Sequence, residues 1–448
     1  MQLPYAPVEF TTSGAVAKPD QVAAAVALAR GEAAGQGEAP THVLLLCHGW
    51  NNTIPEAEAF YTRLTDHIAE QQTDGSARFA VIGLLWPSVR WADDTGNIAG
   101  GGLAVDDPAT ELEQRIDEVV RDPEAAATLR AQVGQLEQSH EARKAFVETI
   151  RQQLLPPPDA VADDDPVPSG FLSGDVEALF DDAEQGYLGL LLAGDGIDGT
   201  AGGAAADTGG AADLGDVPAV PDGAGAAAGF FGNGLSPVVI AKFLLNMGTY
   251  YSMKARAGAV GAGGVTDLLR QLADMATGIP VTLVGHSFGA RVVSAAAGNG
   301  APAHAMCLLQ GAFSHYGFDD AQGPLGEAGA FRKAVEGGAL DGPIVVTHSH
   351  KDLAVRLAYA IASRIAQQTA SGLGDENDRY GGLGANGAVG MPSAEVQALD
   401  LGPVGTTYQF TAHKIYNLTG DAFISGHSAV DGPEVANAVR QAALAQPA

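Results

Sequence analysis

The chain has 448 residues, 46% of them hydrophobic, which is enough to bury a sizeable core and excludes a fibre, a small disulfide scaffold and a wholly disordered protein. Its 24 Lys and Arg against 53 Asp and Glu give a formal net charge of −29, so most of the surface repels nucleic-acid phosphates and anionic lipid headgroups. We therefore expect no nucleic-acid partner.

The start of the chain and its cysteines indicate the compartment only weakly. The N-terminus has no cationic segment followed by an apolar one, and the sequence has no run of about 20 apolar residues. We expect a cytoplasmic protein without a transmembrane segment, although a removed export signal stays an open alternative and the oligomeric state is left open. Cys47 and Cys307 lie in apolar runs, so we expect two core residues rather than a disulfide.

Short apolar runs alternate with amphipathic stretches in two parts of the chain, which predicts the following elements in chain order. They are a strand at 43–46, a helix at 54–70, a strand at 79–86, helices at 237–254 and 265–275, a strand at 280–284, a helix from residue 287, a strand at 305–309, a helix at 327–336, a strand at 343–347, a helix at 353–368, a strand at 414–418 and a helix at 433–444. This alternation is typical of an α/β fold with a mainly parallel sheet covered by helices on both faces.

Residues 98–236 interrupt this alternation. Residues 109–155 are rich in Glu, Arg, Gln and Ala, which predicts about two exposed helices, whereas residues 156–234 are rich in Pro, Gly, Ala and Asp and are expected to be mobile in part. We therefore divide the chain into an α/β core, residues 1–97 and 237–448, and an acidic insertion, residues 98–236. The insertion is either a lid that shapes a binding site or a solvated appendage.

The sharpest motif is a G-x-S-x-G sequence at residues 285–289, with Ser287 at its centre. A short motif of this kind occurs by chance in a Gly-rich chain, so its surroundings decide its weight. Here a buried strand leads into it and a helix leads out. Such a strained strand-to-helix turn exposes the serine hydroxyl and points helix N–H groups at a developing oxyanion.

A second turn follows the strand at 43–46 and contains His48, Gly49 and Trp50. A turn after a parallel strand can place a backbone N–H beside the serine, so Trp50 and Phe288 are the candidate oxyanion donors. We expect His48, Gly49 and His286 to lie next to the substrate.

The two motifs and the order of strands and helices around them resemble the α/β-hydrolase superfamily, over about two thirds of the chain. Asn51-Asn52 and Trp86-Pro87-Ser88 are similar to sequences of a poorly characterised bacterial branch. The resemblance implies an α/β-hydrolase fold and a chain order of Ser, then Asp or Glu, then His, each in the loop after a successive strand.

Mapped onto this chain, the superfamily order places the acid at Asp352, after the strand at 343–347, and the base at His427, after the last strand. A helix N-cap is the alternative role of Asp352, and the two roles are compatible. Asp319 or Asp320 would serve if the protein used the earlier acid position found in some relatives.

Metal and cofactor motifs are weak. The Asp- and Asn-rich residues 375–382 lack the spacing of a calcium loop, and His348 and His350 have no helix-spaced third ligand for zinc. No G-x-G-x-x-G follows a strand. We expect neither a metal nor a cofactor.

These residues predict a serine hydrolase with a small-molecule acyl ester as its substrate. The Ser287, His427 and Asp352 side chains would form a catalytic triad that passes through an acyl-enzyme. An acyltransferase, a thioesterase or an amidase would use the same triad. A catalytically silent binding or scaffold protein of the same fold is the alternative from another class.

Overall fold

The computed structural model describes residues 1–33, 38–72, 75, 77–88, 108–120, 122–155, 167–193, 236–322, 326–352, 354–356 and 381–447. Within these ranges, none of the helices has the length and apolarity needed to cross a membrane.

In the described ranges, eight strands form one sheet in the order β1-β3-β2-β4-β5-β6-β8-β7, and every neighbouring pair is parallel. The strands are β1 (Tyr5–Glu9), β2 (His42–Cys47), β3 (Phe79–Leu85), β4 (Val281–His286), β5 (Ala305–Leu309), β6 (Ile344–His348), β7 (Val396–Asp400) and β8 (Ile415–Thr419). Because the strands are parallel, their carboxyl ends meet at one edge of the sheet. The predicted α/β class with a mainly parallel sheet is confirmed.

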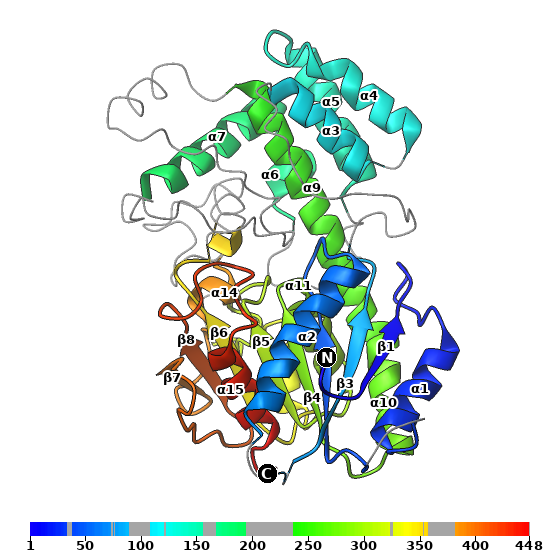
Figure 1. Ribbon diagram of the computed structural model, residues 1–448. Helices are drawn as coiled ribbons and strands as arrows, with labels where there is room; N and C mark the ends of the chain where they lie inside the picture. The colour runs from blue at the N-terminus through cyan, green and yellow to red at the C-terminus, as the bar shows by residue number, and fades with distance from the viewer. Residues whose placement is uncertain are drawn as a thin grey trace.

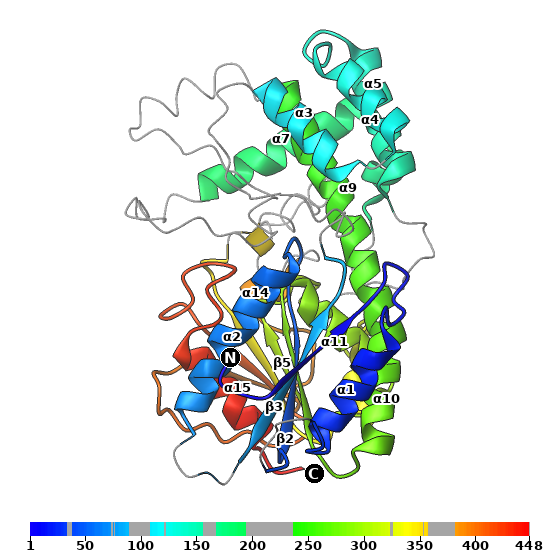
Figure 2. The same ribbon diagram turned by 45° about the vertical axis from the view of Figure 1, so that its right-hand side comes forward.

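Helices cover both faces of this sheet (Figures 1 and 2). Alternate residues of β2 point to opposite sides, so Val43 and Leu45 belong to one apolar core while Leu44 and Leu46 belong to the other. One face packs against α2 (Ile54–Glu70) and α15 (Pro433–Ala443). The other packs against α1 (Pro19–Ala29), α9 (Pro237–Val260), the π-helix η2 (Gly261–Val265), α10 (Thr266–Met275), α11 (Phe288–Gly298) and α12 (Arg332–Glu336).

The N-terminal half of α9 extends beyond the sheet into a separate group of helices, which Figure 1 shows above the edge where the strands end. These are α3 (Pro108–Val119), α4 (Pro123–Val133), α5 (His140–Gln153), α6 (Ser169–Ser173) and α7 (Val176–Ala193). The described part of residues 109–155 holds three helices, where about two were expected. They are not fully exposed, because Leu112, Phe146 and Ile150 are completely buried. The apolar core on the α9 side of the sheet continues into this group.

Most predicted elements have the expected positions, with two differences. The predicted helix at 327–336 is helical only over α12, because Gly329 packs against backbone: a Cβ on this residue would lie 2.3 Å from the carbonyl oxygen of Tyr316. The edge strands β1 and β7 were not predicted. Of the predicted helix at 353–368, only residues 354–356 lie in the described ranges, and they are helical.

Candidate functional site

The candidate residues lie in loops at the carboxyl edge of the sheet. Ser287 follows β4, Asp352 lies four residues beyond β6, and His427 lies in the loop after β8. In the sheet, β5 separates β4 from β6, and β8 lies next to β6. Parallel strands of this order therefore bring three residues that are distant in sequence to one edge.

Ser287 occupies a strained turn between β4 and α11. Its φ of 56° and ψ of −123° are unusual for a residue with a side chain. The flanking glycines permit the turn, because a Cβ on Gly285 would lie 2.4 Å from the carbonyl oxygen of Gly289, and a Cβ on Gly289 would lie 2.2 Å from that of Cys47. The predicted strand–turn–helix context of the motif is therefore present, with close backbone contacts on both sides of the serine.

The Ser287, His427 and Asp352 side chains form a continuous hydrogen-bonded chain. The Ser287 Oγ lies 2.8 Å from His427 Nε2, and His427 Nδ1 lies 2.8 Å from Asp352 Oδ2. Because the carboxylate accepts, Nδ1 carries the proton, which leaves Nε2 to accept the serine hydroxyl. All three side chains are buried. This arrangement can move a proton from Ser287 to His427 and stabilise the resulting imidazolium.

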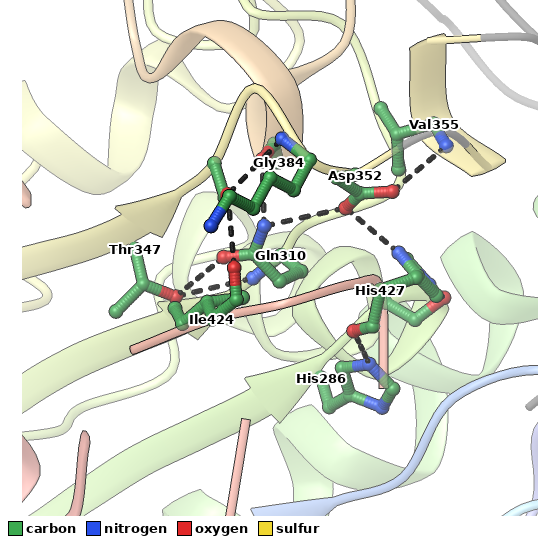
Figure 3. Close-up of polar contacts among 11 residues, drawn as sticks. His286, Gln310, Thr347, Asp352, Val355, Gly384, Ile424 and His427 are labelled. Carbon is green, nitrogen blue, oxygen red and sulfur yellow. Dashed lines mark hydrogen bonds and ion pairs between the residues drawn. The ribbon is translucent and has the colours of Figure 1, made fainter. Parts of the chain in front are cut away.

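Asp352 also begins the next helical turn. Its Oδ1 accepts the N–H of Val355 at 3.0 Å, while its Oδ2 accepts His427 Nδ1, as Figure 3 shows. The predicted N-cap and the contact with His427 thus use different oxygens of one carboxylate. The earlier candidates lie elsewhere: the carboxylate of Asp319 lies against Gly390, and Asp320 caps a surface turn through the N–H of Gln322.

His286 contacts the backbone of His427 and is electrically neutral. Burial, with a smaller contribution from the nearby His427, lowers the pKa of His286 to about 3. Its Nε2–H donates to the carbonyl oxygen of His427 at 3.0 Å (Figure 3), and the two rings lie 5.1 Å apart. His286 therefore orients the loop that carries His427.

The loop before His427 is tied to the loop that carries Asp352. Ser349 Oγ donates to Asp421 Oδ1 at 2.9 Å and contacts the carbonyl oxygen of Ile424, and His350 Nδ1 lies 2.9 Å from Asp421 Oδ2. Burial of Asp421 opposes ionisation, but the hydrogen bonds from His350 and Ser349 outweigh it and lower the pKa of its carboxyl. Asp421 thus stays ionised and joins the two loops.

The turn after β2 lies directly beside the serine. A Cβ on Gly49 would lie 2.9 Å from the Cβ of Ser287 and 3.4 Å from its Oγ. Among the residues that the structure describes, the backbone N–H groups of Trp50 and Phe288 have no hydrogen-bond acceptor. Phe288 opens α11, and a helix-start N–H commonly lacks a partner within its helix, whereas Trp50 lies in the turn between β2 and α2. Both N–H groups are therefore available to an anion.

The side chains of the two donor residues pack together in an aromatic cluster. The Trp50 and Phe288 rings lie 5.9 Å apart, and Tyr250 on α9 lies 5.1 Å from Phe288 and 6.4 Å from Trp50. All three residues are buried. The helix that enters the α3–α7 group therefore contacts both candidate oxyanion residues.

The two additional motifs of the sequence contact each other. The Trp86 ring stacks on His48 with centroids 5.9 Å apart, and its Nε1–H donates to the His48 carbonyl oxygen at 2.9 Å. Ser88 Oγ donates to the carbonyl oxygen of Asn52 at 2.8 Å, and its own carbonyl oxygen accepts the N–H of Asn51. Together the motifs brace the turn that presents Trp50.

This packing places the His48 ring in the core. The ring lies between Trp86 and Tyr61 and is almost completely buried, and burial lowers its pKa to about 4. Of the residues expected beside a substrate, the structure thus places Gly49 against Ser287 and His286 against His427, whereas the described contacts of the His48 ring are structural.

No group of three or more His, Cys, Asp or Glu that could bind a metal occurs among the residues that the structure describes. Residues 375–380 of the weak calcium motif lie outside them. His348 packs near Thr419, and burial lowers its pKa, while His350 pairs with Asp421. Cys47 and Cys307 are buried free thiols, as predicted.

Sequence analysis missed several residues of this site. Gln310 contacts Asp352, Asp421 anchors the His427 loop, and Tyr250 contacts the oxyanion candidates. The only sequence signal for Gln310 was a polar residue at the end of an apolar strand. Comparison of this chain with models of protein families, with curated proteins and with solved structures gives no match.

Proposed function

We propose that the protein is a serine hydrolase with an α/β-hydrolase fold that cleaves a carboxylic ester through an acyl-enzyme. The observation that carries this proposal is the chain of two 2.8 Å hydrogen bonds that joins Asp352, His427 and Ser287. The strained turn at Ser287 and the order Ser, Asp, His along the sequence agree with the superfamily resemblance.

In the proposed mechanism, Ser287 Oγ attacks the ester carbonyl while its proton moves to His427 Nε2. Asp352 stabilises the imidazolium, and the carbonyl electron pair moves onto oxygen, which the N–H groups of Trp50 and Phe288 bind. Collapse of this intermediate breaks the C–O bond, and His427 returns the proton to the departing alkoxide. Water then attacks the acyl-enzyme with His427 again as the base, which releases the carboxylic acid and restores Ser287.

The first test is labelling with a fluorophosphonate followed by intact-mass spectrometry. We expect one adduct on the wild-type protein and none on Ser287→Ala. The matched control is Ser294→Ala, because Ser294 is a completely buried serine on α11, the helix that follows Ser287, and its Oγ contacts Met306 Sδ. The control should label like the wild type. A folded wild-type protein that takes no label would contradict the proposal and favour a silent binding protein.

The second test identifies the bond. Turnover of p-nitrophenyl esters of increasing acyl length should be measured beside an acyl thioester and an acyl anilide of the same chain length. The proposal expects the ester to give the highest kcat/KM and the product to be the free acid. Faster turnover of the thioester or the anilide would overturn the ester assignment but retain the triad. Transfer of the acyl group to an added alcohol in preference to water would overturn hydrolysis and indicate an acyltransferase that uses the same triad.

A further inference from the structure

Gln310 lies between the serine and the acid. It directly follows β5, the strand between β4 and β6, and is completely buried. Its φ of 47° lies in the left-handed region, which residues with side chains seldom adopt. A strained, buried and polar residue at this position needs strong local contacts to persist.

Both ends of the Gln310 amide are engaged, which fixes its orientation (Figure 3). Oε1 accepts the Thr347 hydroxyl at 3.0 Å, and Nε2 donates to the carbonyl oxygen of Gly384 at 2.8 Å and to Asp352 Oδ2 at 3.3 Å. Because a carbonyl oxygen only accepts, the end facing Gly384 is the NH₂ group. The amide therefore presents a donor, not an acceptor, to Asp352.

Three hydrogen bonds to the carboxylate of Asp352 define its plane. Oδ2 accepts from Gln310 Nε2 and His427 Nδ1, while Oδ1 accepts from the N–H of Val355. Rotation of the carboxylate would lengthen at least one of these bonds. Among the residues that the structure describes, Oδ2 without Gln310 would keep only the imidazole of His427 as a partner.

The same short segment also holds the serine. The carbonyl oxygen of Leu309 accepts the N–H of Ser287 at 3.0 Å, and the N–H of Ala312 donates to the carbonyl oxygen of Ser287 at 3.1 Å. Residues 309–312 thus contact the backbone of Ser287 on one side and, through Gln310, the carboxylate of Asp352 on the other. This one segment therefore contacts both Ser287 and Asp352, the two outer members of the hydrogen-bonded chain.

We propose that Gln310 is a positioning residue that holds Asp352, and through it His427, in the geometry for proton transfer with Ser287. The proposal rests on the proposed function, since it concerns the same hydrogen-bonded chain. The alternative is that Gln310 only joins β5 to the segment around Gly384, as a structural amide would.

Asn417 supplies the matched control. It is a buried amide on β8 that binds both the N–H and the carbonyl oxygen of Ala388, at 2.9 and 2.8 Å. It thus ties a strand to the same region of the chain as Gln310, but both of these bonds go to Ala388 and neither goes to a residue of the triad. Gln310→Met and Asn417→Leu each remove such an amide without a large change in volume.

The first experiment compares ester turnover by these variants. We expect Gln310→Met to lower kcat by about 10- to 100-fold, the size typical of a misplaced catalytic group, with little change in KM. Asn417→Leu should keep a kcat close to that of the wild type, even if its urea midpoint falls as much as that of Gln310→Met. Equal effects of the two variants on kcat, or an unchanged kcat in Gln310→Met, would overturn the proposal.

If Gln310→Met does not fold, a second variant, Gln310→Glu, tests the same proposal. In Gln310→Glu the introduced acid can still donate to Asp352 when protonated, but it repels Asp352 when ionised. The kcat of this variant relative to the wild type should therefore fall as the pH rises. A purely structural role gives a ratio that does not depend on pH, and that result would contradict the proposal.

The downfield proton resonance of His427 Nδ1–H separates this proposal from the proposed function. A wild-type protein that takes no fluorophosphonate label refutes the hydrolase assignment but leaves this resonance measurable. If Gln310 positions Asp352, the resonance should shift or broaden in Gln310→Met and stay in place in Asn417→Leu. An unchanged resonance in both variants would refute the positioning role alone.

Discussion

Of the histidine–aspartate hydrogen bonds, those of His304 and His427 lie at opposite edges of the sheet. Where β5 and β6 begin, His304 Nδ1 lies 2.6 Å from Asp341 Oδ1. At the edge where the same strands end, His427 Nδ1 lies 2.8 Å from Asp352 Oδ2. Distance alone therefore does not distinguish the candidate site from the other pair.

Burial and a third partner distinguish the two pairs. The Asp341 side chain is 61% exposed, whereas Asp352 is completely buried. His427 Nε2 faces the Ser287 hydroxyl; among the residues that the structure describes, no hydroxyl lies within hydrogen-bond distance of His304 Nε2. Water screens the interaction between His304 and Asp341. The His427–Asp352 pair lies in a low-dielectric site, where the carboxylate stabilises a positive charge on its histidine more strongly.

Removal of the negative charge from each pair should give the largest contrast. We expect Asp352→Asn to lower kcat for an ester by about 10⁴-fold, because an amide favours the wrong imidazole tautomer and does not stabilise the imidazolium. Asp341→Asn should leave kcat close to that of the wild type. The measurement is p-nitrophenyl ester turnover at saturating substrate.

Circular dichroism and the urea midpoint are the controls for folding in this pair of variants. If both substitutions lowered kcat equally, or if Asp352→Asn kept full activity while folded, the functional difference between the two edges would be refuted.

The two ends of α11 allow a steric test of the same comparison. Gly289, at the start of the helix, lies so close to Cys47 that we expect Gly289→Ala to lower the free energy of unfolding by about 3 kcal/mol. Gly298 ends the helix at the other edge, and a Cβ there would lie 3.7 Å from its nearest neighbour, an ordinary contact. Gly298→Ala should therefore be neutral or stabilising in urea denaturation. Equal losses would show that the turn at Ser287 is not tightly packed.

The strand order and the G-x-S-x-G motif made it possible to predict which residues form the hydrogen-bonded chain. They did not predict the residues that hold this chain in place. Ser287 and His427 follow apolar strands with turn residues around them, which local sequence shows. Asp352 was expected to cap a helix or to contact the histidine, and its two carboxylate oxygens make one of these hydrogen bonds each. Gln310 carries no spacing signature, because its partners come from three other segments and its left-handed φ depends on tertiary contacts.

The helices of residues 109–155 show a similar limit. Their charged composition indicated exposure, yet Ile116, Phe146 and Ile150 lie on faces that are completely buried. The partner of these faces is α9, more than 80 residues later in the sequence, where Gly248 lets Ile150 approach closely. Composition averages the two faces of a helix, so it does not show which residues meet a distant partner.

Acid stability should give the smallest of these effects, and it concerns the carboxyl edge. His286 and His48 lie at the carboxyl edge with pKa values lowered by burial to about 3 and about 4, from 6.5. Below pH 6.5 the unfolded chain binds protons that the folded protein does not bind, so stability falls as the pH falls toward these lowered values. At pH 5 each histidine should lower the free energy of unfolding by about 2 kcal/mol relative to pH 8.

The test is urea denaturation of His286→Gln. The free energy of unfolding of this variant should fall less between pH 8 and pH 5 than that of the wild type, by this amount. Between pH 7.5 and 8.5, where both states leave this histidine neutral, the two proteins should have the same pH slope, and identical acid losses would show that His286 is protonated in the folded protein.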